Sequence, residues 1–289
     1  MQPLAGVLVA DLTRYLPGPF ASRELLRLGA RVVRIGPPDG DPLATGSPGV
    51  YRELNEGKEH VVWDAKSQPA PTELLAADVV LEGFRPGVFD RFDLTLAESA
   101  IVCSITGYGA DGPLAAHAGH DLNYLGYAGA LADTAPALPP VQIADLGAGA
   151  QAAVIEVLAA LLERTRTGRG TRIVVSMTHN AHRFVAHRLA GEPIPRLLTG
   201  GVACYRTYET ADGRYLTVAA LEPRFWQNLC ELLGRPDLVG RQFEPELPEL
   251  DDLFRSRPLA DWRALLEGAD TCVGPVLTLA EAADELTRR

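Results

Sequence analysis

The hydrophobic and polar positions in the first third of the chain follow two alternating patterns. Short, continuous apolar runs have the length and β-branched content of buried strands. Between them, a segment such as 17–30 begins with proline and glycine and then places apolar residues at helical spacing. The predicted strands are GVLVADL (6–12), RVVRI (31–35), HVVW (60–63), DVVLE (78–82), AIVCSI (100–105) and TRIVVSM (171–177). Strands that alternate with helices predict an α/β fold, with an open, largely parallel sheet covered by helices on both faces.

The pattern changes at about residue 190. Before that point, residues 143–170 form the longest helical pattern, with small residues at its start, a basic last turn and a glycine stop. After it, two alternating strands flank the turn signal ADGR, which predicts a hairpin, and short amphipathic helices follow. We therefore expect a large α/β domain over residues 1–190 and a small α+β domain over 191–289. The acidic, proline-containing segment 245–252 is expected to be a solvated loop.

Composition narrows the classes of function. The 289 residues are 47% hydrophobic and 22% charged, as in a globular protein of one large or two ordinary domains. We predict no membrane span, because no apolar run reaches roughly 20 residues, and we interpret the N-terminus as a strand and not as a signal peptide. The formal charge of −10 argues against nucleic-acid and membrane-surface binding. Four scattered cysteines predict reduced thiols in the cytoplasm, with neither a disulfide framework nor a zinc site.

Four polar residues stand at the ends of predicted elements. His120 and Asp121 follow a glycine-rich loop, Asp145 interrupts an apolar run at the start of the long helix, and Glu222 separates a strand from a helix. Three of them have a plain alternative: a structural histidine for His120, and an N-cap for Asp145 and Glu222. Two acids and a histidine at element ends nevertheless suit proton transfer, because they supply two bases and an orienting carboxylate.

Other segments point less clearly to chemistry. The turn LTRYLPGPFAS lacks both GxGxxG and GxxxxGK[ST], which disfavours a Rossmann dehydrogenase and a P-loop NTPase. Arg85, in a rigid loop after a predicted strand, suits a phosphate, although a surface arginine is the simpler interpretation. His179 and His182 are three residues apart on a predicted helix, but without a third ligand we expect no metal site.

In chain order, these segments resemble the family III CoA-transferases (the CaiB/BaiF family), which include the α-methylacyl-CoA racemases. The matching stretches are LLRLGARVVRIGPPDGD, LEGFRPGV, ITGYGADGP, AGHDLNYL, IADLGAGAQAAV, TGRGTRIVVSM, CYRTYETADGRYLTVAALEPRFW and CVGPVL. They extend over nearly the whole chain. The resemblance implies a large domain with a Rossmann-like sheet, a small α+β domain, an interlocked homodimer and a site where the two domains meet.

Two residues imply the racemase branch of the family. The transferases use an aspartate that forms a mixed anhydride and then a CoA thioester, and it matches Asp145. The racemases keep that aspartate and add a histidine in the motif GHD and a glutamate in EP[QK]F, which match His120 and Glu222. The implied activity is 1,1-proton transfer at the α-carbon of a 2-methylacyl-CoA thioester. His120 would serve one face of the substrate and Asp145 the other, with Glu222 orienting His120 and Asp121 shaping the site.

The resemblance also implies how the acyl-CoA is held. The CoA-binding residues that it suggests are Arg85, Lys58, Asn55, Gly107, Tyr108 and Gly109. Nearby backbone N–H groups would stabilise the enolate oxygen. No metal or redox cofactor is expected, because the thioester itself stabilises the carbanion, and coenzyme A enters only as part of the substrate.

The chain departs from the family pattern at three places. Gly36 and Glu59 stand where an acidic and a basic residue are common, and the sequence ends soon after CVGPVL, so that the C-terminal return to the large domain is expected to be shortened. Two alternatives to the racemase therefore stay open. One is a CoA-transferase with Asp145 as the nucleophile. The other is a catalytically silent CoA-binding homologue or partner subunit.

Overall fold

The computed structural model describes residues 1–191, 194 and 196–287. It divides into two compact units, Met1–His187 and Arg188–Arg289. The sequence analysis expected the division between residues 190 and 191. Each unit has its own hydrophobic core, so each is described by itself.

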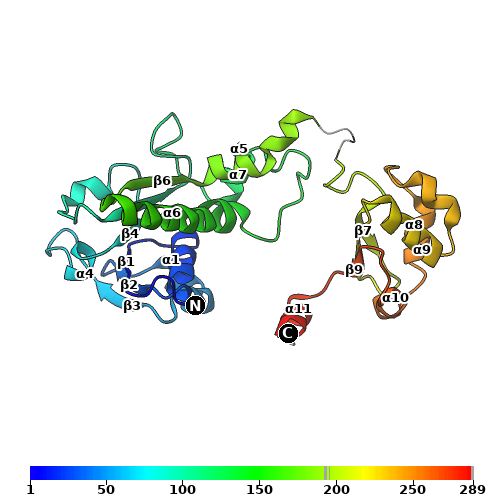
Figure 1. Cartoon of the computed structure of the whole chain (residues 1–289), viewed down its shortest axis with the longest axis horizontal. Helices are drawn as coiled ribbons and strands as arrows, with labels where there is room; N and C mark the ends of the chain where they lie inside the picture. Colours follow the sequence, from blue (N-terminus) through cyan, green and yellow to red (C-terminus); the bar gives the residue numbers. More distant parts are fainter. Residues whose placement is uncertain (192–193, 195, 288–289) are drawn as a thin grey trace. The chain divides into compact units, whose positions relative to one another are not determined.

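The first unit is built on a six-stranded sheet in which every strand pair is parallel (Figure 1). Its strands are β1 (Leu8–Asp11), β2 (Arg31–Gly36), β3 (Glu59–Val62), β4 (Val79–Glu82), β5 (Ile101–Thr106) and β6 (Arg172–Ser176). Their order across the sheet is β3-β2-β1-β4-β5-β6. This order reverses direction between β1 and β4, and open α/β sheets bind ligands at such a switch point. The predicted α/β class and all six predicted strands are confirmed.

Helices cover both faces of this sheet. Up to residue 190 they are α1 (Pro17–Arg27), α2 (Pro42–Gly46), α3 (Pro48–Asn55), α4 (Thr72–Leu75), α5 (Asp121–Tyr127), the π-helix η2 (Ala144–Gln151), α6 (Ala152–Thr167), α7 (Met177–Val185) and the 3₁₀ segments η1 (Phe89–Phe92) and η3 (Ala186–Ala190). Successive strand residues point to opposite faces. Val9 accordingly belongs to the core beneath α1 and α6, whereas Ala10 belongs to the core that includes Leu74 of α4.

The long predicted helix over 143–170 is present as η2 followed directly by α6. It ends at Gly168, which has a φ of +70°. By length and composition alone, Ala144–Thr167 is apolar enough to cross a membrane, which the sequence analysis did not anticipate. Here the helix lies along β5 and β6 and buries Ala153 and Val157, so it serves as a core helix of the α/β layers.

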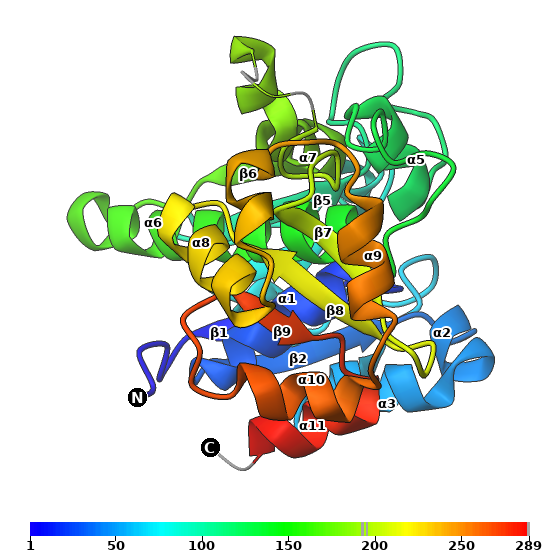
Figure 2. The ribbon, with the colours of Figure 1, turned by 90° about the vertical axis from the view of Figure 1, so that its right-hand side faces the viewer.

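The second unit contains a three-stranded antiparallel sheet, β7-β8-β9 (Figure 2). Its elements are β7 (Tyr205–Glu209), β8 (Tyr215–Ala219), α8 (Pro223–Leu232), η4 (Pro236–Arg241), α9 (Pro248–Phe254), α10 (Leu259–Leu266), β9 (Val273–Pro275) and α11 (Leu279–Thr287). The predicted hairpin around ADGR is confirmed as β7 and β8. Its core is built around Trp226 and Trp262, whose indole N–H groups donate to the carbonyls of Leu238 and Phe254.

The expectation of a solvated loop at 245–252 is wrong. Residues from Pro248 onward form α9, and Leu247 and Leu250 are fully buried in the core of the second unit. The acidic residues dominated the sequence pattern, but the two leucines are three positions apart and therefore lie on the same side of a helical turn.

Candidate active site

A cavity of about 600 Å³, here called the main pocket, opens at the carboxyl ends of β1, β4 and β5. The strand ends, the loops after them and the start of α1 contribute residues 13–15, 17–18, 83–86 and 105–107. The remaining lining residues are 115, 117–120, 123–124, Asp145 and Met177. The pocket therefore lies at the switch point of the sheet, where the topology alone favours a ligand site. His120, Asp145, Arg85 and Gly107, all named from the sequence, belong to its wall.

His120 immediately precedes α5. Its N–H donates to Oδ1 of Asn123 at 3.1 Å, and its carbonyl accepts the N–H of Asn123 at 2.8 Å. These two bonds hold the first turn of α5 and thereby set the direction of the His120 side chain. The imidazole is exposed and meets the ring of Tyr15 edge-on, with 6.1 Å between the ring centroids.

Asp145 lies in the first turn of η2, where its backbone N–H donates to Oδ1 of Asp121 at 2.9 Å. Burial raises the pKa of Asp145 to about 7, and the nearby charge of Asp121 contributes further in the same direction. A carboxyl group with this pKa is present in both protonation states near neutral pH, so it can take up or release a proton. Asp121 itself does not line the main pocket. It acts on the pocket through Asp145.

The glycine-rich loop after β5 is packed tightly behind the pocket. A Cβ atom on Gly107 would lie 2.5 Å from Cε1 of Tyr124, so only glycine fits there. Tyr108 is buried against the Tyr124 ring, with 5.1 Å between centroids, and does not line the pocket. The N–H of Gly109 donates to Oγ1 of Thr106 at 3.0 Å. It is therefore engaged within the protein and not directed at a ligand.

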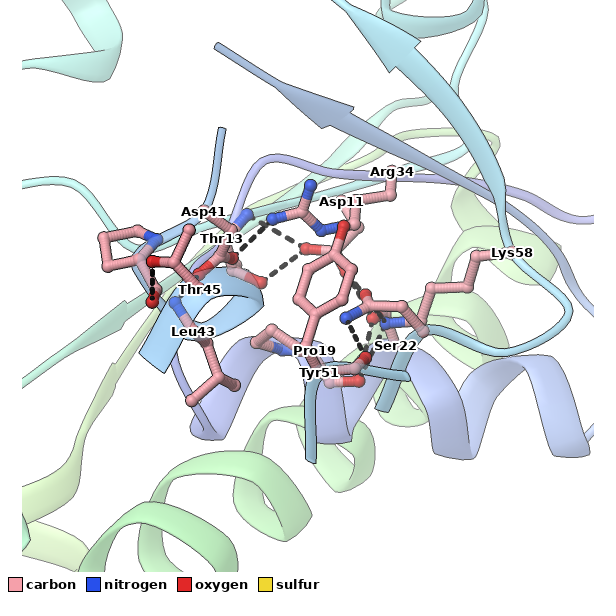
Figure 3. A network of polar contacts seen from close by, with 12 residues as sticks. Asp11, Thr13, Pro19, Ser22, Arg34, Asp41, Leu43, Thr45, Tyr51 and Lys58 are labelled. Carbon is pink, nitrogen blue, oxygen red and sulfur yellow. Dashed lines mark hydrogen bonds and ion pairs between the residues drawn. The ribbon is translucent and has the colours of Figure 1, made fainter. Parts of the chain in front are cut away.

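Lys58 and Asn55, two residues suggested for CoA binding, are both buried inside the protein instead. Figure 3 shows Lys58 beside Asp11 and Pro19. The Lys58 ammonium donates to the carbonyl of Pro19 at 2.9 Å and to Oδ1 of Asn55 at 3.1 Å, and it pairs with Oδ2 of Asp11 at 3.3 Å. The side chains of Lys58 and Asp11 are both 0% exposed. In this arrangement neither Lys58 nor Asn55 can reach a phosphate, because their polar atoms point into the core.

The Asp11 carboxylate is the centre of this buried cluster. It also accepts hydrogen bonds from the hydroxyl of Ser22, at 2.5 Å, and from the hydroxyl and N–H of Thr13. Burial by itself would raise the pKa of Asp11, but the Lys58 charge and these hydrogen bonds hold it below its usual range. The cluster ties the end of β1 to α1 and to the loop after α3. It fixes the backbone from which the main pocket is built.

Glu59, which departs from the family pattern, is also accounted for. Both of its carboxylate oxygens accept hydrogen bonds from the guanidinium of Arg31, each at 2.7 Å, on the exposed edge strand β3. The Glu59 charge is therefore paired at the surface.

A second cavity, of about 230 Å³, shares part of its wall with the main pocket. We call it the aromatic pocket. Its lining residues are Leu12, Thr13, Arg14, Ile35, Gly36, Pro37, Pro38, Trp63, Asp64, Ala65, Lys66, Phe84 and Phe92. Phe92 meets the rings of Trp63 and Phe84 edge-on at 5.3 and 5.4 Å. No motif in the sequence pointed to this cavity. The available signal was Trp63 at the end of the predicted strand at 60–63, with Asp64 and Lys66 soon after it.

Glu222 belongs to the second unit, where it precedes α8. Its carbonyl accepts the N–H groups of Phe225 and Trp226, but its side chain makes no capping hydrogen bond. The N-cap alternative for this side chain is therefore not observed. The hydrogen bond between Glu222 and His120 stays a prediction.

The His179 and His182 rings make separate contacts. Nδ1 of His179 lies 2.7 Å from the hydroxyl of Ser176, and Nδ1 of His182 lies 3.0 Å from the carbonyl of Ala128. Over residues 1–191, 194 and 196–287, no three histidine, cysteine, aspartate or glutamate side chains cluster in a way that could hold a metal ion. In the same part of the chain, all four cysteines are unpaired, and only Cys272 is exposed.

Comparison with known proteins identifies relatives of both predicted branches. The model of CoA-transferase family III matches residues 4–289. An alpha-methylacyl-CoA racemase of Mus musculus is 34% identical over 308 residues, covering 96% of this chain and 79% of the relative. An acetyl-CoA:oxalate CoA-transferase of Acetobacter aceti is 31% identical, covering 98% and 82%. Among solved structures, Rv3272 of Mycobacterium tuberculosis matches with a TM-score of 0.83 and 30% identity, covering 98% of this chain and 85% of that one.

Proposed function

This chain belongs to CoA-transferase family III, and we propose that within the family it is an acyl-CoA racemase that acts on 2-methyl-branched thioesters. One observation carries the proposal: His120 lines the same cavity as Asp145, an aspartic acid with a pKa of about 7. A racemase needs two groups that can exchange protons near neutral pH, one for each face of the α-carbon. The similarity to the mouse racemase supports the same conclusion.

The proposed reaction needs no net oxidation and no added reactant. One base, for example His120, takes the α-proton, and the electron pair of the broken C–H bond moves onto the thioester carbonyl to give an enolate. Neutral Asp145 then donates its proton to the opposite face of the α-carbon, and the electron pair returns from the enolate to form the new C–H bond. For the other enantiomer the roles are exchanged. The thioester carries the developing charge, so we propose that no metal or redox cofactor takes part.

Two further parts of the proposal concern orientation. The first is that Glu222 orients the His120 ring and thereby selects its tautomer, as the resemblance implies. Asp121 keeps Asp145 from ionising too readily, because it lies close enough to raise the Asp145 pKa. We also propose that the substrate is bound as the CoA thioester, with its acyl α-carbon between His120 and Asp145 in the main pocket. A cytoplasmic homodimer is part of the same proposal.

The test follows the α-proton of a 2-methylacyl-CoA in D2O by NMR, with each enantiomer supplied separately. The wild-type protein should exchange the α-proton of both enantiomers and interconvert them without an added acyl acceptor. The variants His120→Ala and Asp145→Asn should each lose interconversion, because each removes the base on one face. His117→Ala is the matched control, since His117 lines the same pocket without a proposed role. Absence of exchange despite thioester binding would contradict the racemase.

The transferase remains the second candidate, because the chain is also 31% identical to the acetyl-CoA:oxalate CoA-transferase. In that reaction the ionised Asp145 carboxylate attacks the thioester carbonyl, the thiolate of CoA leaves, and a mixed anhydride forms. CoA then attacks the anhydride at the aspartyl carbonyl, which releases the carboxylate of the first acyl group and leaves an aspartyl-CoA thioester. Mass spectrometry of the intact protein would detect this adduct on Asp145. If the chain is a transferase, the His120→Ala variant should still form this adduct. If the chain is a racemase, neither the wild type nor the variant should form it.

A further inference from the structure

The main pocket and the aromatic pocket share three lining residues, Thr13, Arg14 and Phe84. The two cavities therefore adjoin at these three side chains, and a ligand that occupies both would lie across them. Acyl-CoA is an extended molecule with a thioester at one end, an adenosine at the other and a diphosphate between them. If the thioester lies between His120 and Asp145, the aromatic pocket is the adjoining space that offers ring surfaces to an adenine.

Arg14 is the only cation among the three shared residues. The hydroxyl and N–H of Thr13 are already donated to Asp11, and the N–H of Phe84 donates to Oε2 of Glu82 at 2.7 Å. Arg14 differs from both. It is half-buried, and across the described part of the chain its guanidinium makes no hydrogen bond or ion pair. A partly desolvated guanidinium without a protein partner is well suited to an anionic ligand.

The backbone beside Arg14 gives an independent reason to regard this turn as functional. Tyr15 has a φ of +64°, in the left-handed region that residues other than glycine seldom adopt. Such strain costs free energy and tends to persist where a site requires it. Here the turn brings the neighbouring Arg14 and Tyr15 side chains into the wall of the same pocket, with Tyr15 against His120.

We infer that Arg14 binds the diphosphate of coenzyme A where the two pockets adjoin, acting with Arg85 from the loop after β4. Arg85 is exposed and lines the main pocket, and its guanidinium likewise has no polar partner among the described residues. Two guanidinium groups from different loops can each hold phosphate oxygens bidentately. The inference rests on the proposed function, because it takes coenzyme A as the ligand. It adds a specific contact that discriminates nucleotide-bearing thioesters from simple ones.

The test is isothermal titration calorimetry with three probes: CoA, ADP and pantetheine. ADP carries the diphosphate without the thiol arm, and pantetheine carries the thiol arm without phosphate. Arg14→Ala should weaken binding of CoA and ADP about tenfold to a hundredfold, as expected for losing charge-assisted hydrogen bonds. Pantetheine binding should not change. Arg14→Lys keeps the charge but loses the planar guanidinium that can bind a phosphate bidentately. Its affinities for CoA and ADP should therefore lie between those of Arg14→Ala and the wild type.

Arg27→Ala is the matched control. Arg27 is an exposed arginine on α1, paired with Glu24 at 2.9 Å, and it lines neither pocket. Arg27→Ala removes the same charge as Arg14→Ala. A general electrostatic effect would therefore weaken CoA binding in both variants, whereas loss of a specific contact would weaken it only in Arg14→Ala. Circular dichroism of each variant checks that the fold is intact.

The outcomes separate this inference from the proposed function. If the wild type binds CoA and Arg14→Ala binds it equally well, the diphosphate contact is wrong and the racemase proposal stands. If the wild type binds ADP but not CoA, the CoA-based function fails, and the loss or retention of ADP binding in Arg14→Ala still decides the diphosphate contact. If the wild type binds neither, both are overturned.

Discussion

Asp145 should make the stability of the first unit depend on pH in a specific direction. Its pKa is about 7 in the folded protein, because it is half-buried and lies near Asp121, whereas an unfolded aspartate has a pKa of 3.8. Between these two values the folded state holds a proton that the unfolded state has already released. Because the unfolded state then binds fewer protons, the free energy of unfolding falls as pH rises through this window. Above about pH 7 both states are ionised and the loss is complete.

The size of the effect follows from the two pKa values. Each pH unit between them corresponds to about 1.4 kcal/mol, so the full loss is about 4 kcal/mol. Between about pH 5 and about pH 8.5, the free energy of unfolding of the wild type should therefore fall by about 2–3 kcal/mol through this group. Asp145→Asn has no ionisable group at this position. It should therefore lose that much less stability than the wild type over the same range.

The assay is urea denaturation followed by circular dichroism at several pH values in this range. Asp121→Asn adds a second arm, because its amide oxygen can still accept the Asp145 N–H while the charge is removed. The pKa of Asp145 should then fall, and the pH-dependent loss should become smaller. Asp111→Asn, at an exposed position outside the main pocket, controls for charge removal in general. Identical pH profiles for the wild type and Asp145→Asn would refute the raised pKa and, with it, the basis for Asp145 as a neutral proton donor.

Three further predictions test other parts of the structure. Lys58→Met should destabilise the first unit by about 3–5 kcal/mol in urea denaturation, because it leaves the Asp11 carboxylate buried without its partner. Unchanged stability would show that the buried ion pair is absent. Gly18→Ala should lower the free energy of unfolding by about 1–3 kcal/mol and weaken CoA binding, because the new Cβ would lie 2.1 Å from side-chain atoms of Thr13 that are held by Asp11. Calorimetric titration measures the loss of CoA binding. Trp262→Ala should cost about 3–5 kcal/mol in the second unit, measured by hydrogen exchange, with no loss of protection in β1 to β6.

Much of the architecture could be predicted from local patterns. The six parallel strands, the long helix after residue 143 and the hairpin at ADGR all appear where the sequence places them. Strand length, helical periodicity and turn residues are properties of neighbouring positions, so they survive into the folded state. The prediction of a solvated loop at 245–252 was wrong, because the abundant charges of this segment concealed two core leucines.

The candidate site shows a different balance. Their positions at element ends, together with the family resemblance, singled out His120 and Asp145, and both line the cavity at the carboxyl ends of the parallel strands. Nothing local distinguishes Lys58, in a loop between a helix and a strand, from a solvent-exposed lysine. Only the fold brings Asp11 and the carbonyl of Pro19 around its ammonium group, and so removes it from any ligand.

The sequence by itself therefore determined which elements form, and which residues have suitable chemistry, since both depend on residue type and spacing. The tertiary structure decided which of those groups are available and how acidic they are. Burial and the charge of Asp121, 24 positions away in the chain, raise the pKa of Asp145, and strand ends far apart in sequence jointly build the two adjoining pockets beside Arg14. Desolvation and Coulomb interactions depend on distances in space, which local sequence does not specify.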